Sequence, residues 1–394
     1  MKTISILGST GSIGVSTLDV CRQHLDKFTV IALTANTDVD KLLMQCQEFS
    51  PQYAVMVDKQ SAIKLEQGLK KANCLNTEVL SGKESLDFVA SLNANDMVMA
   101  AIVGAAGLLP ALAAVKAGNK LLLANKEALV LSGHLFIGAA RKNNVEILPI
   151  DSEHNAIFQC LPVNFHDGLH KVGVSKVLLT ASGGPFLNAT KEDLQQVTPE
   201  QAIAHPNWNM GKKISVDSAT MMNKGLEVVE ARWLFEIEPD FIQVVVHPQS
   251  IIHSMVEYDD GSVLAQMGNP DMRTPIAHAM AWPERIESGV KKLDLFEISQ
   301  LDFKRPDFEL FPCLRLAFDA LKENDSATAI LNAANEMTVE SFLNNEIAFN
   351  DIPRINEQVL TSMPAVNADS IEQLLAIDQE ARALSSQFIK ERRH

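Results

Sequence analysis

Short apolar runs and longer amphipathic stretches alternate through the first 150 residues, and this alternation constrains the fold more than any other feature. The strand-like runs are Ile4–Leu7, Phe28–Thr34, Tyr53–Val57, Met97–Val103, Lys120–Leu123 and Val145–Ile150. Helix-length amphipathic stretches such as Val39–Phe49 and Ser85–Leu92 separate them. Strands that alternate with helices form parallel sheets, and continuous apolar runs suit strands that are buried on both faces. Residues 1–150 are therefore predicted to form a doubly wound parallel sheet.

The pattern changes after residue 150. Further strands are predicted at Val172–Thr180, Ile242–His247, Ile252–Tyr258 and Ser262–Met267, and Asp260-Gly261 predicts a hairpin turn. Residues 181–213, rich in glycine, proline and polar residues, predict a long mobile loop. These features indicate a central mixed α/β domain over 151–281, with a linker at 282–308. Residues 309–394 predict a C-terminal helical bundle, with helices at Leu310–Lys322, Ser326–Leu343, Ile355–Ser362 and Ser370–Glu391.

Charge and cysteine usage exclude some classes of function. The formal net charge of −15 argues against nucleic-acid binding, although a small anionic substrate remains open because local lysines or a cation can reverse the local field. The five cysteines are scattered, without a Cys-x-x-Cys pair, which fits reduced thiols and gives no zinc signature. Residues 1–7 lack the apolar core of a signal peptide, so a cytoplasmic location is expected.

One uncharged stretch raises the question of a membrane span. Met97–Val115 holds 19 residues without a charge, but Gly104, Gly107 and Pro110 interrupt it. A buried strand followed by a glycine turn and a helix explains this composition better than a membrane-spanning helix does. The expectation is that the protein does not associate with membranes.

A glycine-rich segment, Gly8-Ser-Thr-Gly11-Ser-Ile-Gly14, follows the first predicted strand and opens a helix. Glycines permit a tight turn and let the backbone approach a pyrophosphate, which the helix N-terminus then attracts. The alternative is a plain glycine-rich turn between a strand and a helix. The position of the glycine-rich segment after the first strand of a βαβ unit favours a dinucleotide site in a Rossmann-type domain.

Carboxylates and other polar groups gather in two further segments. Asp151 and Glu153 follow the last strand of the first region and could face one hard cation, with Glu227 as a third oxygen ligand; equally, Asp151 could cap a helix. The absence of a competing Cys or His cluster favours magnesium or manganese over zinc. Residues 205–227 combine hydroxyl, amide, ammonium and carboxylate groups, as a site for a phosphorylated, metal-bound substrate requires, or else form a polar loop and a capped helix.

Other residues leave two interpretations open. Lys126 and Glu127 follow a strand end, where they could contact substrate or nicotinamide or lie in a solvated helical turn. His205 and Trp208 could close over a ligand, but a lone His or Trp is more often simply packed. Neither of the two tyrosines, Tyr53 and Tyr258, has a Lys four residues later, so the Tyr-x-x-x-Lys chemistry of short-chain dehydrogenases is not available.

Taken together, these motifs resemble the 1-deoxy-D-xylulose 5-phosphate reductoisomerase family along the whole chain. The resemblance rests on Gly8–Gly14, Ala124-Asn-Lys-Glu127, Asp151-Ser-Glu-His-Asn-Ala-Ile-Phe158, Thr180-Ala-Ser-Gly-Gly-Pro-Phe186, His205-Pro-Asn-Trp208, Asp217–Glu227 and Leu331-Asn-Ala-Ala-Asn-Glu336. It implies an N-terminal NADPH domain, a central catalytic domain, a C-terminal helical domain and a homodimer.

The resemblance also implies a role for each matching residue. The metal ligands would be Asp151, Glu153 and Glu227, binding Mg2+, Mn2+ or Co2+. The substrate would contact Lys126, Ser152, Glu153, Ser182, His205, Trp208, Ser218, Asn223, Lys224 and Glu227, with Ser182, Ser218, Asn223 and Lys224 at its phosphate. Catalysis would involve Lys126, Asp151, Glu153, Glu227 and His205, and the lid over residues 181–213 would include His205, Trp208 and Met210. NADPH would contact Gly8, Thr10, Gly11, Ser12, Ile13, Asn36, Thr37, Asn125, Glu127 and Gly211.

The implied reaction has two stages: a retro-aldol cleavage and re-addition that gives a branched aldehyde phosphate, and its reduction to 2-C-methyl-D-erythritol 4-phosphate. The chain departs from the family at Asn36-Thr37-Asp38, where relatives often have a basic residue that could bind the ribose 2′-phosphate. Two rival hypotheses are a metal-independent semialdehyde dehydrogenase, which would leave the three acids without a purpose, and a dinucleotide-sensing protein without turnover.

Overall fold

The computed structural model describes residues 1–204 and 211–392 of the 394-residue chain. The chain divides into two compact units. The first comprises residues 1–128, 136–155 and 271–291, and the second comprises residues 129–135, 156–270 and 292–394. The helices α6 (Glu127–Lys142) and α7 (Ser152–Cys160) contribute residues to both.

A seven-stranded parallel sheet, in the order β4-β3-β2-β1-β5-β6-β7, forms the centre of the first unit. Its strands are β1 (Lys2–Leu7), β2 (Phe28–Ala35), β3 (Tyr53–Met56), β4 (Glu78–Ser81), β5 (Met97–Ala100), β6 (Lys120–Leu123) and β7 (Ile147–Pro149). The central strands are buried along most of their length, as the continuous apolar runs predict. The order reverses between β1 and β5, so the predicted doubly wound sheet is confirmed and a ligand crevice is expected at that point.

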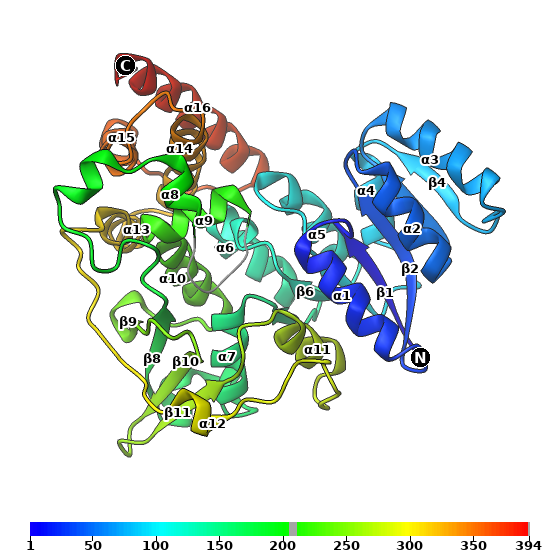
Figure 1. Ribbon diagram of the computed structural model, residues 1–394, viewed down its shortest axis with the longest axis horizontal. Helices are drawn as coiled ribbons and strands as arrows, with labels where there is room; N and C mark the ends of the chain where they lie inside the picture. The colour runs from blue at the N-terminus through cyan, green and yellow to red at the C-terminus, as the bar shows by residue number, and fades with distance from the viewer. Residues whose placement is uncertain (205–210, 393–394) are drawn as a thin grey trace. The chain divides into compact units, whose positions relative to one another are not determined.

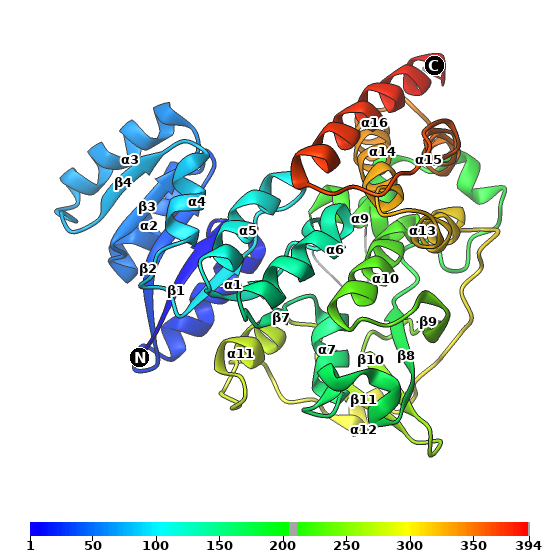
Figure 2. The same cartoon turned by 180° about the vertical axis from the view of Figure 1, so that it is seen from behind.

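Helices connect these strands. They are α1 (Ser12–Gln23), α2 (Val39–Phe49), α3 (Lys59–Lys71), α4 (Glu84–Ala90) and α5 (Leu108–Lys116), with α11 (Arg273–Ala281) added from later in the chain. Right-handed crossovers place α1–α3 on one face of the sheet and α4 and α5 on the other, as Figures 1 and 2 show from opposite sides. Residues 97–115 fold as β5, a short 3-10 turn and α5, and no helix among the described residues has the length and apolar character to cross a bilayer.

The second unit contains a four-stranded mixed sheet in the order β11-β10-β8-β9. Its strands are β8 (Val174–Ala181), β9 (Ile242–Val246), β10 (Ile252–Tyr258) and β11 (Val263–Met267). Strand β8 pairs parallel with β9 and antiparallel with β10, and the hairpin predicted at Asp260-Gly261 joins β10 to β11.

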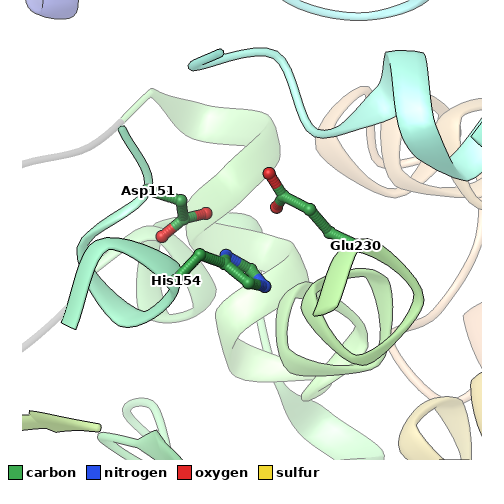
Figure 3. A group of neighbouring side chains, drawn as sticks. All are labelled: Asp151, His154 and Glu230. Carbon is green, nitrogen blue, oxygen red and sulfur yellow. The ribbon is translucent and has the colours of Figure 1, made fainter. Parts of the chain in front are cut away.

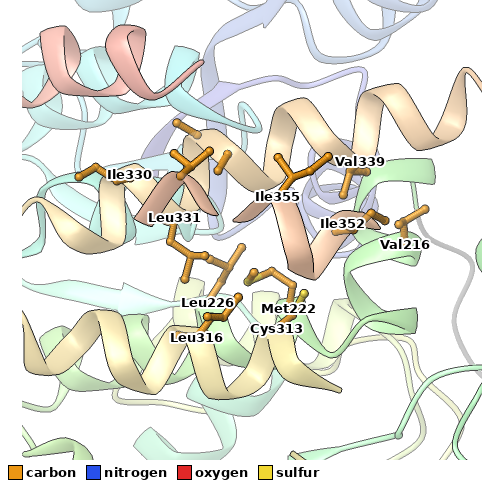
Figure 4. Packing of buried hydrophobic residues seen from close by; sticks show 14 of the residues in the cluster. Val216, Met222, Leu226, Cys313, Leu316, Ile330, Leu331, Val339, Ile352 and Ile355 are labelled. Atoms are coloured by element: carbon orange, nitrogen blue, oxygen red, sulfur yellow. The ribbon is translucent and has the colours of Figure 1, made fainter. Parts of the chain in front are cut away.

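Helices make up the rest of the second unit. They are α8 (Pro199–Ile203), α9 (Lys212–Ala219), α10 (Met222–Leu234), α12 (Leu295–Ile298), α13 (Pro312–Lys322), α14 (Ala327–Leu343), α15 (Asp351–Ser362) and α16 (Ile371–Arg392). One buried apolar cluster joins α9 and α10 to the C-terminal helices, and Figure 4 shows Val216 and Met222 packed near Cys313 and Ile352. The helical character predicted for the C-terminal region is confirmed over the described residues 309–392.

Two expectations about regular structure are wrong in detail. The edge strand β4 was not predicted, because Glu78–Ser81 has no buried residue and little apolar pattern. The segment 181–213 is not irregular throughout: it contains a 3-10 turn at Asp193–Gln196, and α8 begins with a capping box between Thr198 and Gln201. Its mobility stays a prediction.

Candidate active site

The glycine-rich segment forms a tight turn at the carboxyl end of β1. Gly8 has φ +82°, and a Cβ there would lie 2.8 Å from the Ala101 carbonyl oxygen. A Cβ on Gly14 would lie 2.4 Å from the Gly8 carbonyl oxygen, so only glycine lets α1 approach the strand this closely. Among the described residues, no side chain caps the start of α1, at Gly11 and Ser12. Free backbone N–H groups at such a helix end suit a phosphate group.

The turn after β2, Asn36-Thr37-Asp38, contains one charged side chain, that of Asp38. Asn36 and Thr37 are exposed, whereas the Asp38 carboxylate accepts a hydrogen bond from the Lys41 backbone N–H at 3.2 Å and caps α2. The Lys41 ammonium donates to the Thr10 carbonyl oxygen at 2.6 Å. The Lys41 ammonium therefore lies against the glycine-rich turn, whereas the Asp38 carboxylate is hydrogen bonded to the N-terminus of α2.

Residues at the carboxyl ends of β6 and β7 meet because these strands are parallel neighbours. The Lys126 ammonium lies 2.6 Å from Asp151 Oδ2, and Ser152 Oγ donates to Glu153 Oε2 at 2.6 Å. Lys126 and Glu127 are both buried, so the alternative of a solvated helical turn is wrong. The Asn125 amide donates to the Ile102 and Gly104 carbonyl oxygens and so fixes the loop after β5.

Electrostatics keep Asp151 ionised. Burial by itself would raise the pKa of this carboxyl, but the neighbouring Lys126 ammonium and His154 outweigh it and hold the pKa well below its usual range. The Asp151 side chain is partly exposed, and a carboxylate that stays charged at neutral pH is the form that binds a divalent cation.

The predicted phosphate-binding residues Ser182, Ser218, Asn223 and Lys224 all lie in the second unit. Ser182 follows β8, and its hydroxyl accepts a hydrogen bond from the Gly184 N–H at 3.2 Å. A Cβ on Gly184 would lie 2.6 Å from the Ser218 carbonyl oxygen, so this turn packs directly on the last turn of α9. Asn223 and Lys224 lie in the first turn of α10, close behind Ser218 in sequence.

Glu227 accepts hydrogen bonds from both of these α10 residues. The Asn223 amide donates to Glu227 Oε1 at 2.5 Å, and the Lys224 ammonium contacts Glu227 Oε2. The side chains of Lys224 and Glu227 are only 5% and 1% exposed, and a buried carboxylate of this kind needs such partners. The i, i+3 and i, i+4 spacings place all three side chains on one face of the helix.

Two groups of three side chains offer ligand atoms that all lie within 4.8 Å of one another. One is Asp151, Glu153 and Glu227, the predicted set of metal ligands, and the other is Asp151, His154 and Glu230 (Figure 3). The all-oxygen group suits a hard cation such as magnesium. Sequence reasoning missed His154 and Glu230, although each follows a predicted ligand by three residues on the same helix face.

Three predicted lid residues, His205, Trp208 and Met210, lie outside the described residues. Gly211, predicted to contact the cofactor, is exposed and immediately precedes α9.

Comparison with known proteins gives a consistent result along the chain. The pattern of 1-deoxy-D-xylulose 5-phosphate reductoisomerase matches residues 4–133, that of its C-terminal domain matches residues 147–235, and that of the DXP reductoisomerase C-terminal domain matches residues 267–384. The 1-deoxy-D-xylulose 5-phosphate reductoisomerase of Dechloromonas aromatica is 60% identical over 393 residues, covering 100% of this chain and 98% of the relative.

Two solved structures are similar over almost their whole length. DOX-P reductoisomerase in complex with NADPH, fosmidomycin and magnesium superposes with a TM-score of 0.93 at 47% identity, covering 99% of this chain and 98% of the other. The Zymomonas mobilis 1-deoxy-D-xylulose 5-phosphate reductoisomerase in complex with NADPH gives a TM-score of 0.91 at 45% identity, covering 98% of both chains.

Proposed function

The chain belongs to the 1-deoxy-D-xylulose 5-phosphate reductoisomerase family, and from this premise we propose which of its residues perform the reaction. The protein is an NADPH-dependent oxidoreductase that converts 1-deoxy-D-xylulose 5-phosphate to 2-C-methyl-D-erythritol 4-phosphate in the non-mevalonate route to isoprenoid precursors. The assignments below concern its own side chains.

Most of the residues assigned to NADPH, all except Gly211, belong to the first unit. Gly8, Thr10, Gly11, Ser12 and Ile13 would hold the pyrophosphate, because the turn gives no room for a Cβ at Gly14 and presents uncapped N–H groups at α1. The ribose end would lie at Asn36 and Thr37, and Asn125, Glu127 and Gly211 complete the proposed cofactor contacts.

Asp151, Glu153 and Glu227 would hold the divalent cation, and their oxygen chemistry fits Mg2+, with Mn2+ and Co2+ as substitutes. When bound, the cation supplies positive charge for the substrate oxygens, and NADPH supplies the reducing equivalents. Ser152 would orient the substrate hydroxyls, and the buried ammonium of Lys126 would stabilise negative charge near the reacting carbons.

Ser182, Ser218, Asn223 and Lys224 would anchor the substrate phosphate with two hydroxyls, an amide and an ammonium. This anchor has a kinetic purpose, because a retro-aldol cleavage gives two fragments that must recombine before either escapes. His205 and Trp208 would belong to a lid over residues 181–213 that excludes water from the site.

The proposal extends to the organisation of the chain. Residues 1–150 would bind NADPH, residues 151–281 would carry the catalytic groups, residues 282–308 would form a linker, and residues 309–394 would support the catalytic domain. A homodimer is supported by the exposed apolar side chains of Val263 and Leu264 on the edge strand β11, because exposed apolar edge strands invite pairing. The free cysteines of the described chain support a cytoplasmic location.

The proximity of the Asp151, Glu153 and Glu227 oxygens gives the proposal its main support. The test is the consumption of NADPH with 1-deoxy-D-xylulose 5-phosphate, in magnesium and in a chelator, with the product identified by mass. We expect metal-dependent turnover to 2-C-methyl-D-erythritol 4-phosphate. Undiminished turnover in the chelator would favour a metal-independent dehydrogenase, and NADPH binding without turnover would favour a dinucleotide sensor.

A further inference from the structure

The segment Leu331–Glu336 lies in the middle of α14 and carries two asparagines, Asn332 and Asn335, that are both 0% exposed. Asparagine is a weak helix former, and a buried amide costs free energy unless it is hydrogen bonded. Glu336, the last residue of the segment, forms a salt bridge with Arg382 of α16 at 2.6 Å. Apolar packing alone therefore does not explain this segment.

Asn335 connects α14 to α9. Its amide donates to Asp217 Oδ1 at 2.7 Å, and the Lys213 ammonium lies 2.8 Å from Asp217 Oδ2. The Asp217 carboxylate is 1% exposed, so it depends on these partners in place of water. Breaking either contact would leave a buried charge with less compensation.

The C-terminal helices also orient the Asn335 side chain. The Asn356 amide of α15 donates to Asn335 Oδ1 at 3.2 Å, and Thr338 Oγ1 donates to Asn356 Oδ1 at 3.1 Å. Because its carbonyl oxygen is engaged by Asn356, Asn335 turns its N–H group toward Asp217. Two helices of the C-terminal region thus determine the surroundings of one carboxylate on α9.

Asp217 immediately precedes Ser218, the residue proposed to contact the substrate phosphate. Helix α9 has only eight residues, and among the described residues no side chain caps its N-terminus, so packing and these polar contacts must hold it. The Gly184 turn, which carries Ser182 two residues earlier, packs on the Ser218 carbonyl oxygen. A rotation of α9 would consequently change the distance between the two phosphate-binding hydroxyls.

We propose that Asp217, held by Asn335 and Lys213, is a positioning residue that fixes Ser218 for the substrate phosphate. The C-terminal helices α14 and α15 then contribute to substrate affinity without touching the substrate. This inference rests on the proposed role of Ser218. It goes beyond that role by assigning Asn335 of α14 and Lys213 of α9 the function of holding the Asp217 carboxylate in place.

The test replaces Asn335 with leucine, which removes the donor to Asp217 and keeps a similar volume. We expect the KM for 1-deoxy-D-xylulose 5-phosphate and the Ki of inorganic phosphate to rise about tenfold, the effect of losing one hydrogen bond to a charged group. The kcat should change by less than about threefold and the KM for NADPH should not change, because α9 would move the anchor and not the reacting groups.

Asn332→Leu is the matched control. This residue lies on the same helix and is equally buried, but its amide donates to Glu336 at 3.2 Å instead of to α9. Both variants should lose stability, and only Asn335→Leu should weaken phosphate binding. Equal effects of the two changes on the Ki of inorganic phosphate, with both proteins folded, would overturn the proposal.

The paired change Asp217→Asn with Asn335→Asp guards against simple misfolding. In this double variant the amide at position 217 donates to the carboxylate at position 335, which can still accept from the Asn356 amide. The double variant should therefore recover much of the phosphate affinity that Asn335→Leu loses. No recovery in a folded double variant would count against the positioning role. Ser218→Ala tests separately whether Ser218 binds the phosphate at all. If the Ki of inorganic phosphate is unchanged in this variant, the proposed role of Ser218 is wrong, and the positioning role of Asp217 falls with it.

Discussion

At the scale of single residues, Gly14 determines whether the glycine-rich turn can form. An alanine Cβ there would lie 2.4 Å from both the Gly8 carbonyl oxygen and Ser9 Cα, and neither backbone atom can move freely. We expect Gly14→Ala to lower the affinity for NADPH by at least about tenfold and to lower the melting temperature. Titration of NADPH by fluorescence and thermal unfolding measure the two effects.

Gly138 of α6 provides the control, since a Cβ there meets nothing within 4 Å. Gly138→Ala should stabilise the protein by about 1 kcal/mol and leave NADPH binding unchanged. If Gly14→Ala binds NADPH as well as Gly138→Ala does, the turn does not hold the cofactor.

Cofactor preference is a second residue-scale question. Asn36 and Thr37 offer neutral donors, which are about half as strong as charged ones, and Asp38 is engaged as the cap of α2. We expect a weaker preference for NADPH over NADH than in relatives with a basic residue at position 37. Thr37→Arg should raise the ratio of kcat/KM values by tightening NADPH. An unchanged ratio would mean that this turn does not contact the 2′-phosphate.

Some features of single residues could be predicted from the sequence, and others could not. The motifs predicted Asp151, Glu153 and Glu227 as metal ligands, the three acids that also form one candidate group of ligand atoms, and their role in binding a cation stays a prediction. The capping role of Asp38 and the contact from Lys41 to Thr10 were not foreseen, because side-chain direction depends on where α2 begins. The bond from Asn335 to Asp217 spans 118 positions, and no local pattern contains it.

At the scale of elements, α11 carries a buried histidine whose charge state links stability to pH. Burial, reinforced by Arg285, lowers the pKa of His278 to about 4 from 6.5. Between these values the unfolded chain binds more protons than the folded one, so stability falls as the pH falls from 6.5 to 4. His278→Gln should reduce this loss by on the order of 1–3 kcal/mol. Urea unfolding at several pH values measures the free energy of unfolding of both proteins. If this free energy falls equally with pH in the wild type and in His278→Gln, the assignment is contradicted.

Regular elements with a clear apolar pattern were predictable from the sequence, and those without one were not. The predicted bounds of Val39–Phe49 match α2, whose amphipathic pattern and Asp38 cap agree. Strand β4 lacks such a pattern because it pairs at the edge of the sheet, where one side is open and no residue is buried. Helix α8 begins with a capping box, in a segment that several glycines and prolines interrupt.

At the scale of the whole molecule, the first unit gathers residues that are far apart in sequence. Helix α11 packs against α1, and Arg273 forms a salt bridge with Asp19 at 2.9 Å. Such long-range pairing depends on the complete fold. The alternation of strands and helices in residues 1–150 could therefore predict the sheet but not this addition from residues 271–291.

The proposed dimer is also a property of the whole molecule. Leu264 of β11 is 50% exposed, and a lysine there would put a charge on the apolar edge strand. We expect Leu264→Lys to sediment as a monomer, or to dissociate at a much higher concentration than the wild type. Leu75→Lys, at another exposed leucine, should leave the molar mass measured by sedimentation the same as that of the wild type. A dimer of undiminished stability in Leu264→Lys would place the interface elsewhere.

The central claim is that three carboxylates hold one cation for the conversion of 1-deoxy-D-xylulose 5-phosphate. The most direct test is the rate of NADPH oxidation against magnesium concentration for the wild type and for Glu227→Gln, which keeps the size of the side chain and removes its charge. We expect saturable magnesium dependence in the wild type, and in the variant a rate at least about a hundredfold lower at limiting magnesium, with unchanged affinity for NADPH. Near wild-type turnover of Glu227→Gln at limiting magnesium would contradict the account.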